Sequence, residues 1–168
     1  MVNSSDPEVN RVVSDALDHE VTLWPLQPAD DLDHYRRGAS DSDDIMVELR
    51  DLFGRTEDEP LPDLSVFPPE VIEFESPPGT YLDAFPISVM TTSAMRSLTE
   101  ALPDSEIDIR RFRPNLLVET GDDPGHPELG WGGRALSVGE VELELLTGIP
   151  RCVMVTRAMP FWSRRRTC

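Results

Sequence analysis

The residues best suited to chemistry are one cysteine and the arginines found near it in two motifs. Cys152 follows Arg151, and Arg111, Arg113 and Asn115 belong to the run Arg-Phe-Arg-Pro-Asn. A thiolate is a good ligand for a soft metal, and a guanidinium binds phosphate or carboxylate through two parallel hydrogen bonds. Nearby positive charge also favours the thiolate form of a cysteine. The combination predicts a site for an anionic ligand and a soft metal.

Two strands are predicted to position these residues. Alternation with a period of two predicts a strand that begins at Arg110 and places Arg111, Arg113 and Asn115 on one face. The proline within this run cannot donate to a neighbouring strand, so the strand is expected to start or edge a sheet. A second strand, over 151–155, carries the cysteine. The polar row can then converge on one ligand.

Shorter patterns predict the rest of the fold. They indicate helices over 7–18 and 45–53, strands over 21–24 and 81–90 with the second leading into a helix that ends near residue 102, a solvent loop over 27–44, and a hairpin of 134–138 with 141–145. Several short strands with few helices predict an α+β fold, mainly β, whose mixed or antiparallel sheet is curled into a barrel.

The segment Thr91–Ser93 has two interpretations. It lies where a strand turns into a helix, so its hydroxyl groups and backbone N–H groups are placed either to cap the helix or to bind an anion. Trp131, between glycine-rich turns, is predicted to fill the end of the core.

The composition excludes some functions. The 168 residues include 32 acidic and 15 basic ones, for a net charge of -17, which disfavours nucleic acid and anionic membranes as partners. The chain has no lysine, so neither a pyridoxal-phosphate Schiff base nor a P-loop clamp can form within it. The first residues lack the pattern of a signal peptide and no apolar run is long enough for a membrane span, which predicts a cytoplasmic protein.

Further motifs extend the pattern along the chain. Asp-x-x-Pro begins at Asp83, Glu-x-x-Trp joins Glu128 to Trp131, and Leu-x-x-Gly begins at Leu136. Together with the two arginine motifs, in this order from Tyr81 to Met154, they resemble the MOSC domain family. This domain occurs at the C-terminus of molybdenum-cofactor sulfurases and in the mitochondrial amidoxime reducing component.

The resemblance implies a β-barrel domain that binds the molybdopterin form of the molybdenum cofactor. By this resemblance Cys152 is the molybdenum ligand and the catalytic residue, Arg113 and Arg151 contact the cofactor, and Asp83 lies at its site. The chemistry of the residues agrees, because molybdenum is thiophilic and the pterin carries a phosphate. Arg111 and Asn115, which were predicted to share a face with Arg113, are further candidate cofactor ligands.

The family implies an oxidoreductase of N-oxygenated compounds or a sulfur or cofactor carrier. No flavin or iron–sulfur motif is visible, so an external electron donor or sulfur donor protein is the expected partner. One domain is expected over residues 1–168, with a variable upstream part over 1–80, a motif-bearing core over 81–157 and an atypical basic end over 158–168. That end is interpreted as the truncation of a barrel.

Alternatives remain open for the whole chain and for single residues. The chain is alternatively a non-catalytic, truncated MOSC binding module, or a thiol-based carrier without metal, for which His126 is the histidine nearest to Cys152 in sequence. Cys152 itself could be a small buried hydrophobic residue. Arg111 could be a surface charge, and Asp83 could cap a turn.

Overall fold

The computed structural model describes residues 3–40 and 42–157. These residues form two compact units, each described here by itself: one consists of residues up to 37 together with 70–84, and the other of 38–69 together with 85 onward. The expectation of a single domain remains a prediction. Among the described residues, no helix is both long enough and apolar enough to cross a bilayer.

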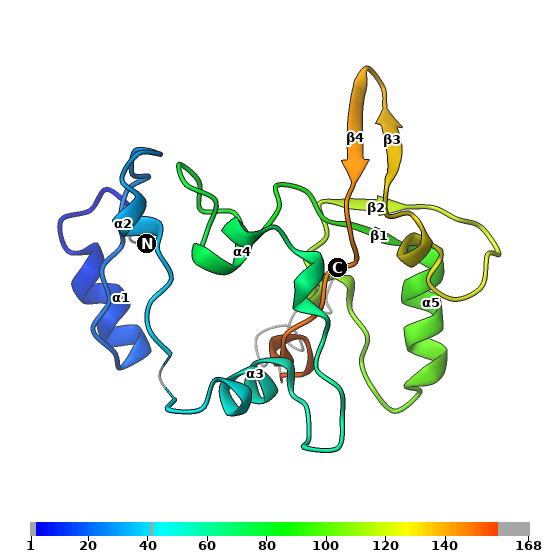
Figure 1. The fold of residues 1–168 in the computed structure, drawn as a ribbon, viewed down its shortest axis with the longest axis horizontal. Helices are drawn as coiled ribbons and strands as arrows, with labels where there is room; N and C mark the ends of the chain where they lie inside the picture. The colour runs from blue at the N-terminus through cyan, green and yellow to red at the C-terminus, as the bar shows by residue number, and fades with distance from the viewer. Residues whose placement is uncertain (1–2, 41, 158–168) are drawn as a thin grey trace, which may run out of the picture. The chain divides into compact units, whose positions relative to one another are not determined.

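The first unit contains the short helices α1 (Val9–Leu17), α2 (Leu32–Tyr35) and α4 (Pro69–Glu73) (Figure 1). Tyr35 is its anchor, because the side chain is only 2% exposed and its hydroxyl donates to the Gln27 carbonyl at 2.6 Å. The predicted helix over 7–18 is confirmed. The predicted solvent loop over 27–44 is wrong at α2, where one aromatic residue in a polar stretch is sufficient to bury a helical turn.

The strand predicted over 21–24 is wrong, because side chains of α1 take the place of a neighbouring strand. The Ser14 hydroxyl bonds both the N–H and the carbonyl of Val21, at 3.0 and 3.2 Å. The Asn10 side chain accepts from the N–H of Leu23 at 2.9 Å. Side-chain bonds of this kind compete with ladder formation.

The second unit contains two small sheets. Strands β1 (Val89–Thr91) and β2 (Leu116–Val118) pair in parallel around helix α5 (Thr92–Ala101), whereas β3 (Arg134–Val138) and β4 (Val141–Leu145) form an antiparallel hairpin (Figure 1). The predicted hairpin is confirmed, with Gly139 in the left-handed region that a two-residue turn requires. The fold is mixed α/β, and the described residues contain no closed barrel.

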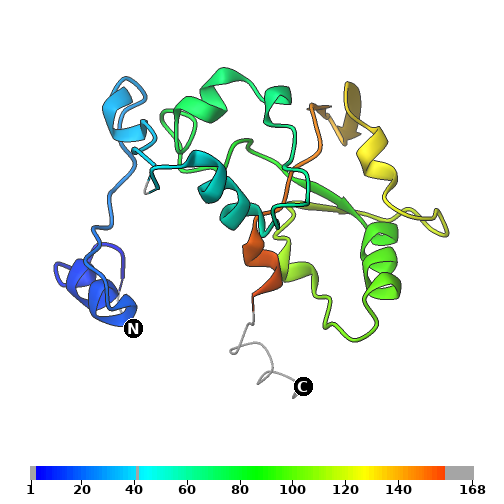
Figure 2. The same ribbon diagram turned by 60° about the horizontal axis from the view of Figure 1, so that its bottom comes forward.

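Helix α3 (Ile45–Phe53) confirms the predicted helix over 45–53. The Asp44 carboxylate accepts from the N–H of Met46, and Gly54 ends the helix in the left-handed region at φ 60°. A Cβ atom at Gly54 would lie 3.0 Å from the side chain of Val153, which begins the 3-10 helix η4 (Val153–Thr156). Figure 2 shows η4 against α3. The glycine therefore both turns the chain and permits this close contact.

The strand predicted from Arg110 is found only from Leu116 onward, as β2, and the strand predicted over 151–155 is absent. The Asp108 carboxylate accepts from the N–H of Arg110 at 2.9 Å, which starts the 3-10 helix η2 (Ile109–Arg111), and Arg113 then adopts a left-handed φ of 48°. The residues directly before β2 are therefore not in a strand, and the prediction that Arg111, Arg113 and Asn115 share one strand face is wrong. Residues 151–155 also form no strand, because the chain turns into η4 directly after Cys152.

Candidate functional site

Hydrogen bonds from two arginines hold the predicted site motifs next to each other. Arg151 donates through Nη1 to the carbonyl of Phe112 at 3.0 Å, and Arg111 donates through Nη1 to the carbonyls of Val155 and Arg157 at 3.2 and 2.7 Å. Each motif thus contributes a guanidinium that binds the backbone of the other. The segment around Cys152 and the segment around Arg113 are neighbours in space, as the sequence predicted, although neither is a strand.

The two linking arginines have a structural role besides any contact with a ligand. The Arg151 guanidinium also lies over the Phe112 ring, 5.9 Å from its centroid. Arg111 is half-buried. Guanidinium groups that satisfy carbonyls at the end of a short helix replace the bonds that a strand partner would give. These contacts leave the predicted cofactor roles of both residues as proposals.

Arg113 has a different environment. Its side chain is exposed, and within the described part of the chain its guanidinium has no hydrogen bond or ion pair. Its backbone lies in the left-handed region at φ 48°, which costs a residue other than glycine on the order of 1 kcal/mol. The turn therefore presents an exposed cation.

Asn115 connects the starts of two strands. Its side-chain oxygen accepts from the N–H of Ser88 at 2.8 Å and from the Ser88 hydroxyl at 3.1 Å. Its own N–H donates to the Ser88 carbonyl at 2.9 Å. These bonds fix the register in which β1 meets β2, and hence the position of the turn that holds Arg113.

Cys152 is a half-buried free thiol at the N-terminal end of η4. Its position follows from both neighbours, because Arg151 is bound to Phe112 and Val153 packs against Gly54. Asp83 is exposed in a bend and belongs to the first unit, whereas the other five predicted site residues belong to the second. Within the described residues, no three His, Cys, Asp or Glu side chains are grouped to hold a metal ion.

Electrostatics also shape the turn before Arg113. The hydrogen bond from Arg110 is the main reason that the pKa of Asp108 is lowered to about 2. The Arg110 guanidinium pairs with both carboxylate oxygens of Asp108. The carboxylate is therefore ionised at neutral pH and caps η2.

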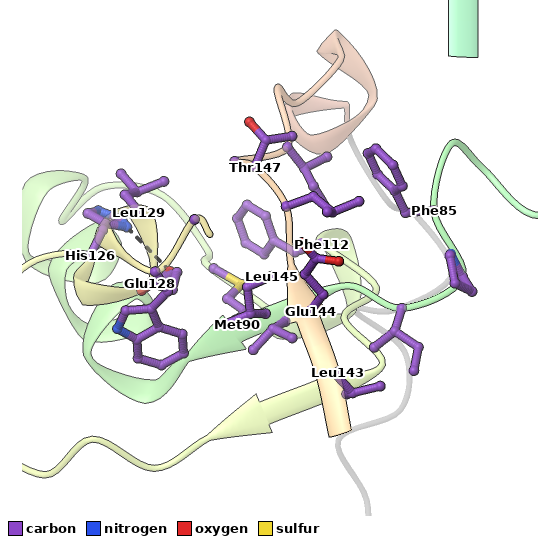
Figure 3. A pocket seen from close by; sticks show the side chains of 18 of the residues that line it. Phe85, Met90, Phe112, His126, Glu128, Leu129, Leu143, Glu144, Leu145 and Thr147 are labelled. Carbon is purple, nitrogen blue, oxygen red and sulfur yellow. Dashed lines mark ion pairs between the residues drawn. The ribbon is translucent and has the colours of Figure 1, made fainter. Parts of the chain in front are cut away.

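A cavity of about 490 Å³ adjoins this region in the second unit (Figure 3). Its wall is mostly apolar, and Arg151 lies at its edge. The side chains that matter below come from β1, the η2 turn, the 3-10 helix η3 (Pro127–Gly130) and β4: Met90, Phe112, His126, Glu128, Trp131, Glu142, Leu143, Glu144 and Leu145. Trp131 lines the cavity and is half-buried, whereas it was predicted to fill the end of the core.

Glu128 lies at this cavity and ends a chain of hydroxyl groups at the start of α5. Its Oε2 accepts from the Thr91 hydroxyl at 2.7 Å, Thr91 contacts Ser93 at 3.1 Å, and Ser93 contacts Thr120 at 2.8 Å. A carboxylate can only accept, so the single proton of Thr91 points to Glu128 and each earlier hydroxyl donates to the next one. Thr91 and Ser93 are both 0% exposed.

This network decides between the two interpretations of Thr91–Ser93. Thr91 is the N-cap, because its hydroxyl accepts from the N–H of Ala94 at 3.1 Å. The negative charge near the helix start is supplied by the chain's own Glu128. Sequence reasoning gave Glu128 no role; the Glu-x-x-Trp motif was the signal that could have found it. His126 lies beside this carboxylate, with 4.0 Å between Nδ1 and Oε1. Its neighbour is therefore Glu128, whereas the alternative of a thiol-based carrier considered it for Cys152.

Comparison with known proteins gives two matches. The family model described as MOSC domain matches residues 77–166, just over half of the chain. The curated protein "Mitochondrial amidoxime-reducing component 1" of Danio rerio is 33% identical over 76 residues, which cover 45% of this chain and 22% of that protein. The match therefore spans much less than the full length of that relative. No solved structure matches significantly.

Proposed function

Because the chain belongs to the MOSC domain family, we propose that it binds the molybdopterin form of the molybdenum cofactor through Cys152 and Arg113. One observation carries the proposal: Arg113 is exposed, strained and without a partner in the described structure, next to a segment that presents a half-buried thiol. The left-handed conformation ends the η2 turn, where the N–H of Arg113 donates to the Ile109 carbonyl at 3.3 Å, and it leaves the guanidinium exposed.

The residues of the site fit such a group chemically. The Cys152 thiolate would bind the metal, since molybdenum is thiophilic, and the Arg113 guanidinium would bind the phosphate of the pterin. Arg151, Asn115 and Arg111 would support this arrangement through the backbone bonds described above. Asp83 is a further candidate cofactor residue on the strength of the family resemblance alone. When bound, the cofactor supplies the redox chemistry, while the protein supplies the thiolate and the positive charge.

The reaction is a finer part of the same proposal. We infer a cofactor-dependent oxidoreductase that acts on N-oxygenated compounds, with a sulfur or cofactor carrier as the other use of the same thiolate. The name of the matching relative, an amidoxime-reducing component, supports the first. An external electron donor or sulfur donor protein and a cytoplasmic location belong to this proposal as well.

Metal and pterin analysis tests the proposal. The full chain is expressed in a host that makes the cofactor, and molybdenum and oxidised pterin are measured per mole of protein for wild type, Cys152→Ser and Cys168→Ser. We expect near-stoichiometric loading of the wild type and of Cys168→Ser, and strong loss of molybdenum in Cys152→Ser. A folded wild-type protein without molybdenum or pterin would refute the proposal.

A non-catalytic MOSC binding module is the second candidate function. It is favoured by one observation, that Arg111, Arg151 and Asn115 all bind the protein's own backbone. Under this alternative these residues only stabilise the turn. A well-folded wild-type protein that carries no molybdenum or pterin would favour the module, whereas a stoichiometric load of the cofactor would exclude it.

A further inference from the structure

We propose that the cavity of the second unit binds an apolar organic cation, an aryl or alkyl ammonium, whose N–H groups meet the carboxylate of Glu128. The proposal concerns a ligand other than the cofactor. It stands on the cavity alone and does not rest on binding of molybdenum at Cys152.

The walls of the cavity favour a ligand whose main part is apolar. Phe112 and Trp131 offer aromatic faces, and Met90, Leu143 and Leu145 supply aliphatic surface. Figure 3 shows the labelled members of this group around one hollow. A volume of about 490 Å³ lies within the usual range for sites that bind small organic molecules.

The charges at the cavity select a cation. Three acidic residues are among those that line it, the little-exposed Glu128 and the exposed Glu142 and Glu144, against one arginine, Arg151. The Arg151 guanidinium is directed at the Phe112 carbonyl and ring. Acidic residues outnumber the arginine in the lining, which gives it a negative character. An anionic ligand would be repelled, whereas a cation would gain an attraction to the little-exposed carboxylate of Glu128 that a neutral ligand would not.

The carboxylate of Glu128 is positioned to accept a hydrogen bond from an N–H group of the ligand. Its side chain is 14% exposed, and Oε2 is fixed by the Thr91 hydroxyl at 2.7 Å. The chain of hydroxyls behind Thr91 orients its protons toward this carboxylate and strengthens that bond. Oε1 lies on the side of His126, with 4.0 Å between it and Nδ1, which exceeds a hydrogen bond. A half-desolvated carboxylate in apolar surroundings attracts a cation more strongly than an exposed one does.

Three naphthalene probes of matched shape test the charge preference. Binding of 2-naphthylmethylamine, 2-naphthylmethanol and 2-naphthoate to the wild-type chain, without molybdenum, is measured by calorimetry at pH 8, where imidazole is ordinarily neutral. We expect the amine to bind about tenfold more tightly than the alcohol, and the naphthoate to show no binding. Equal affinities of amine and alcohol, or tighter binding of the naphthoate, would overturn the proposal.

Variants and spectra locate the site. Glu128→Gln retains an acceptor for Thr91 and is expected to remove the tenfold preference, whereas Glu140→Gln, at the tip of the hairpin, is expected to keep it. If Glu128→Gln fails to fold, NMR of the wild-type protein decides instead: the amine should shift the indole N–H signal of Trp131. Amine binding that leaves this signal in place, or a cavity closed to all probes because two copies associate over it, would contradict the proposal.

Discussion

The start of α5 and the turn at Arg113 belong to the same unit but differ in how their polar and charged side chains are partnered. At the start of α5, the hydroxyl groups of Thr91, Thr92 and Ser93 each have a partner, and the carboxylate of Glu128 is held by a buried threonine. At the other turn the Arg113 guanidinium has no partner among the described residues and its backbone is strained. The first region stabilises the fold, and the second presents an exposed cation at some cost in stability. Both regions contain residues that the sequence suggested for anion binding.

Replacing Thr91 with valine should have the largest effect on the free energy of unfolding. Valine keeps the shape but removes the N-cap bond to Ala94 and leaves Glu128 without its donor, which together should cost about 2–3 kcal/mol. Urea denaturation measures the loss.

Thr99→Val is the matched control, because Thr99 lies on the same helix, is exposed and only bonds the Met95 carbonyl. Its unfolding free energy should change by less than about 0.5 kcal/mol. Equal losses of unfolding free energy in the two variants would show that the start of α5 does not stabilise the fold more than an exposed position of the same helix does.

Removing the Arg111 side chain should have the next largest effect. In Arg111→Met the carbonyls of Val155 and Arg157 lose their donor, so we expect a loss of about 1–2 kcal/mol and faster proteolysis around η4. Arg134→Gln, at an exposed position of β3, removes a positive charge elsewhere and should be near neutral. An unchanged proteolysis pattern in Arg111→Met would mean that this arginine does not fix the cysteine segment.

Elements whose signals are local could be predicted from the sequence. Helix α3 was found through the helical spacing of its apolar residues and through Gly54, and the hairpin through its Gly139 turn, because such patterns and two-residue turns are decided by neighbours in the chain. The resemblance also implied that the two arginine motifs contribute to one site, and their segments lie next to each other in the structure.

Features that depend on side chains distant in sequence could not be predicted. Alternating polarity around Arg113 indicated a strand, but the bond of Asp108 to the N–H of Arg110 produced a 3-10 turn instead. Phe112, the partner of Arg151, is 39 residues away in the sequence, and Glu128, the partner of Thr91, is 37 residues away. No local sequence pattern indicates either contact. The cavity is likewise assembled from several separate segments.

Acid should weaken the turn before Arg113 through Asp108. Its pKa is lowered to about 2, mainly by the hydrogen bond from Arg110, so its contribution is complete above about pH 4 and is lost as the pH falls toward 2. Because the Arg110 side chain is 53% exposed, we expect only about 1 kcal/mol. The difference in unfolding free energy between wild type and Asp108→Asn should shrink across this range. The same difference for Asp104→Asn, at an exposed position, should be small throughout; a constant difference for Asp108→Asn would contradict the assignment.

Glycine substitution at the two left-handed residues gives the smallest change in stability and the sharpest test of the comparison. Asp18 ends α1 at φ 51° and Arg113 lies at φ 48°, so Asp18→Gly and Arg113→Gly each relieve strain. Part of the gain is offset by the flexibility of glycine in the unfolded chain, which leaves about 0.5 kcal/mol of stabilisation. Only Arg113→Gly should lower the molybdenum and pterin content of the purified protein, by several-fold, since only that residue is proposed to hold a ligand. Stabilisation of Arg113→Gly with full cofactor loading would show that the strain at this turn has no part in binding, and the contrast between the two regions would then be one of packing alone.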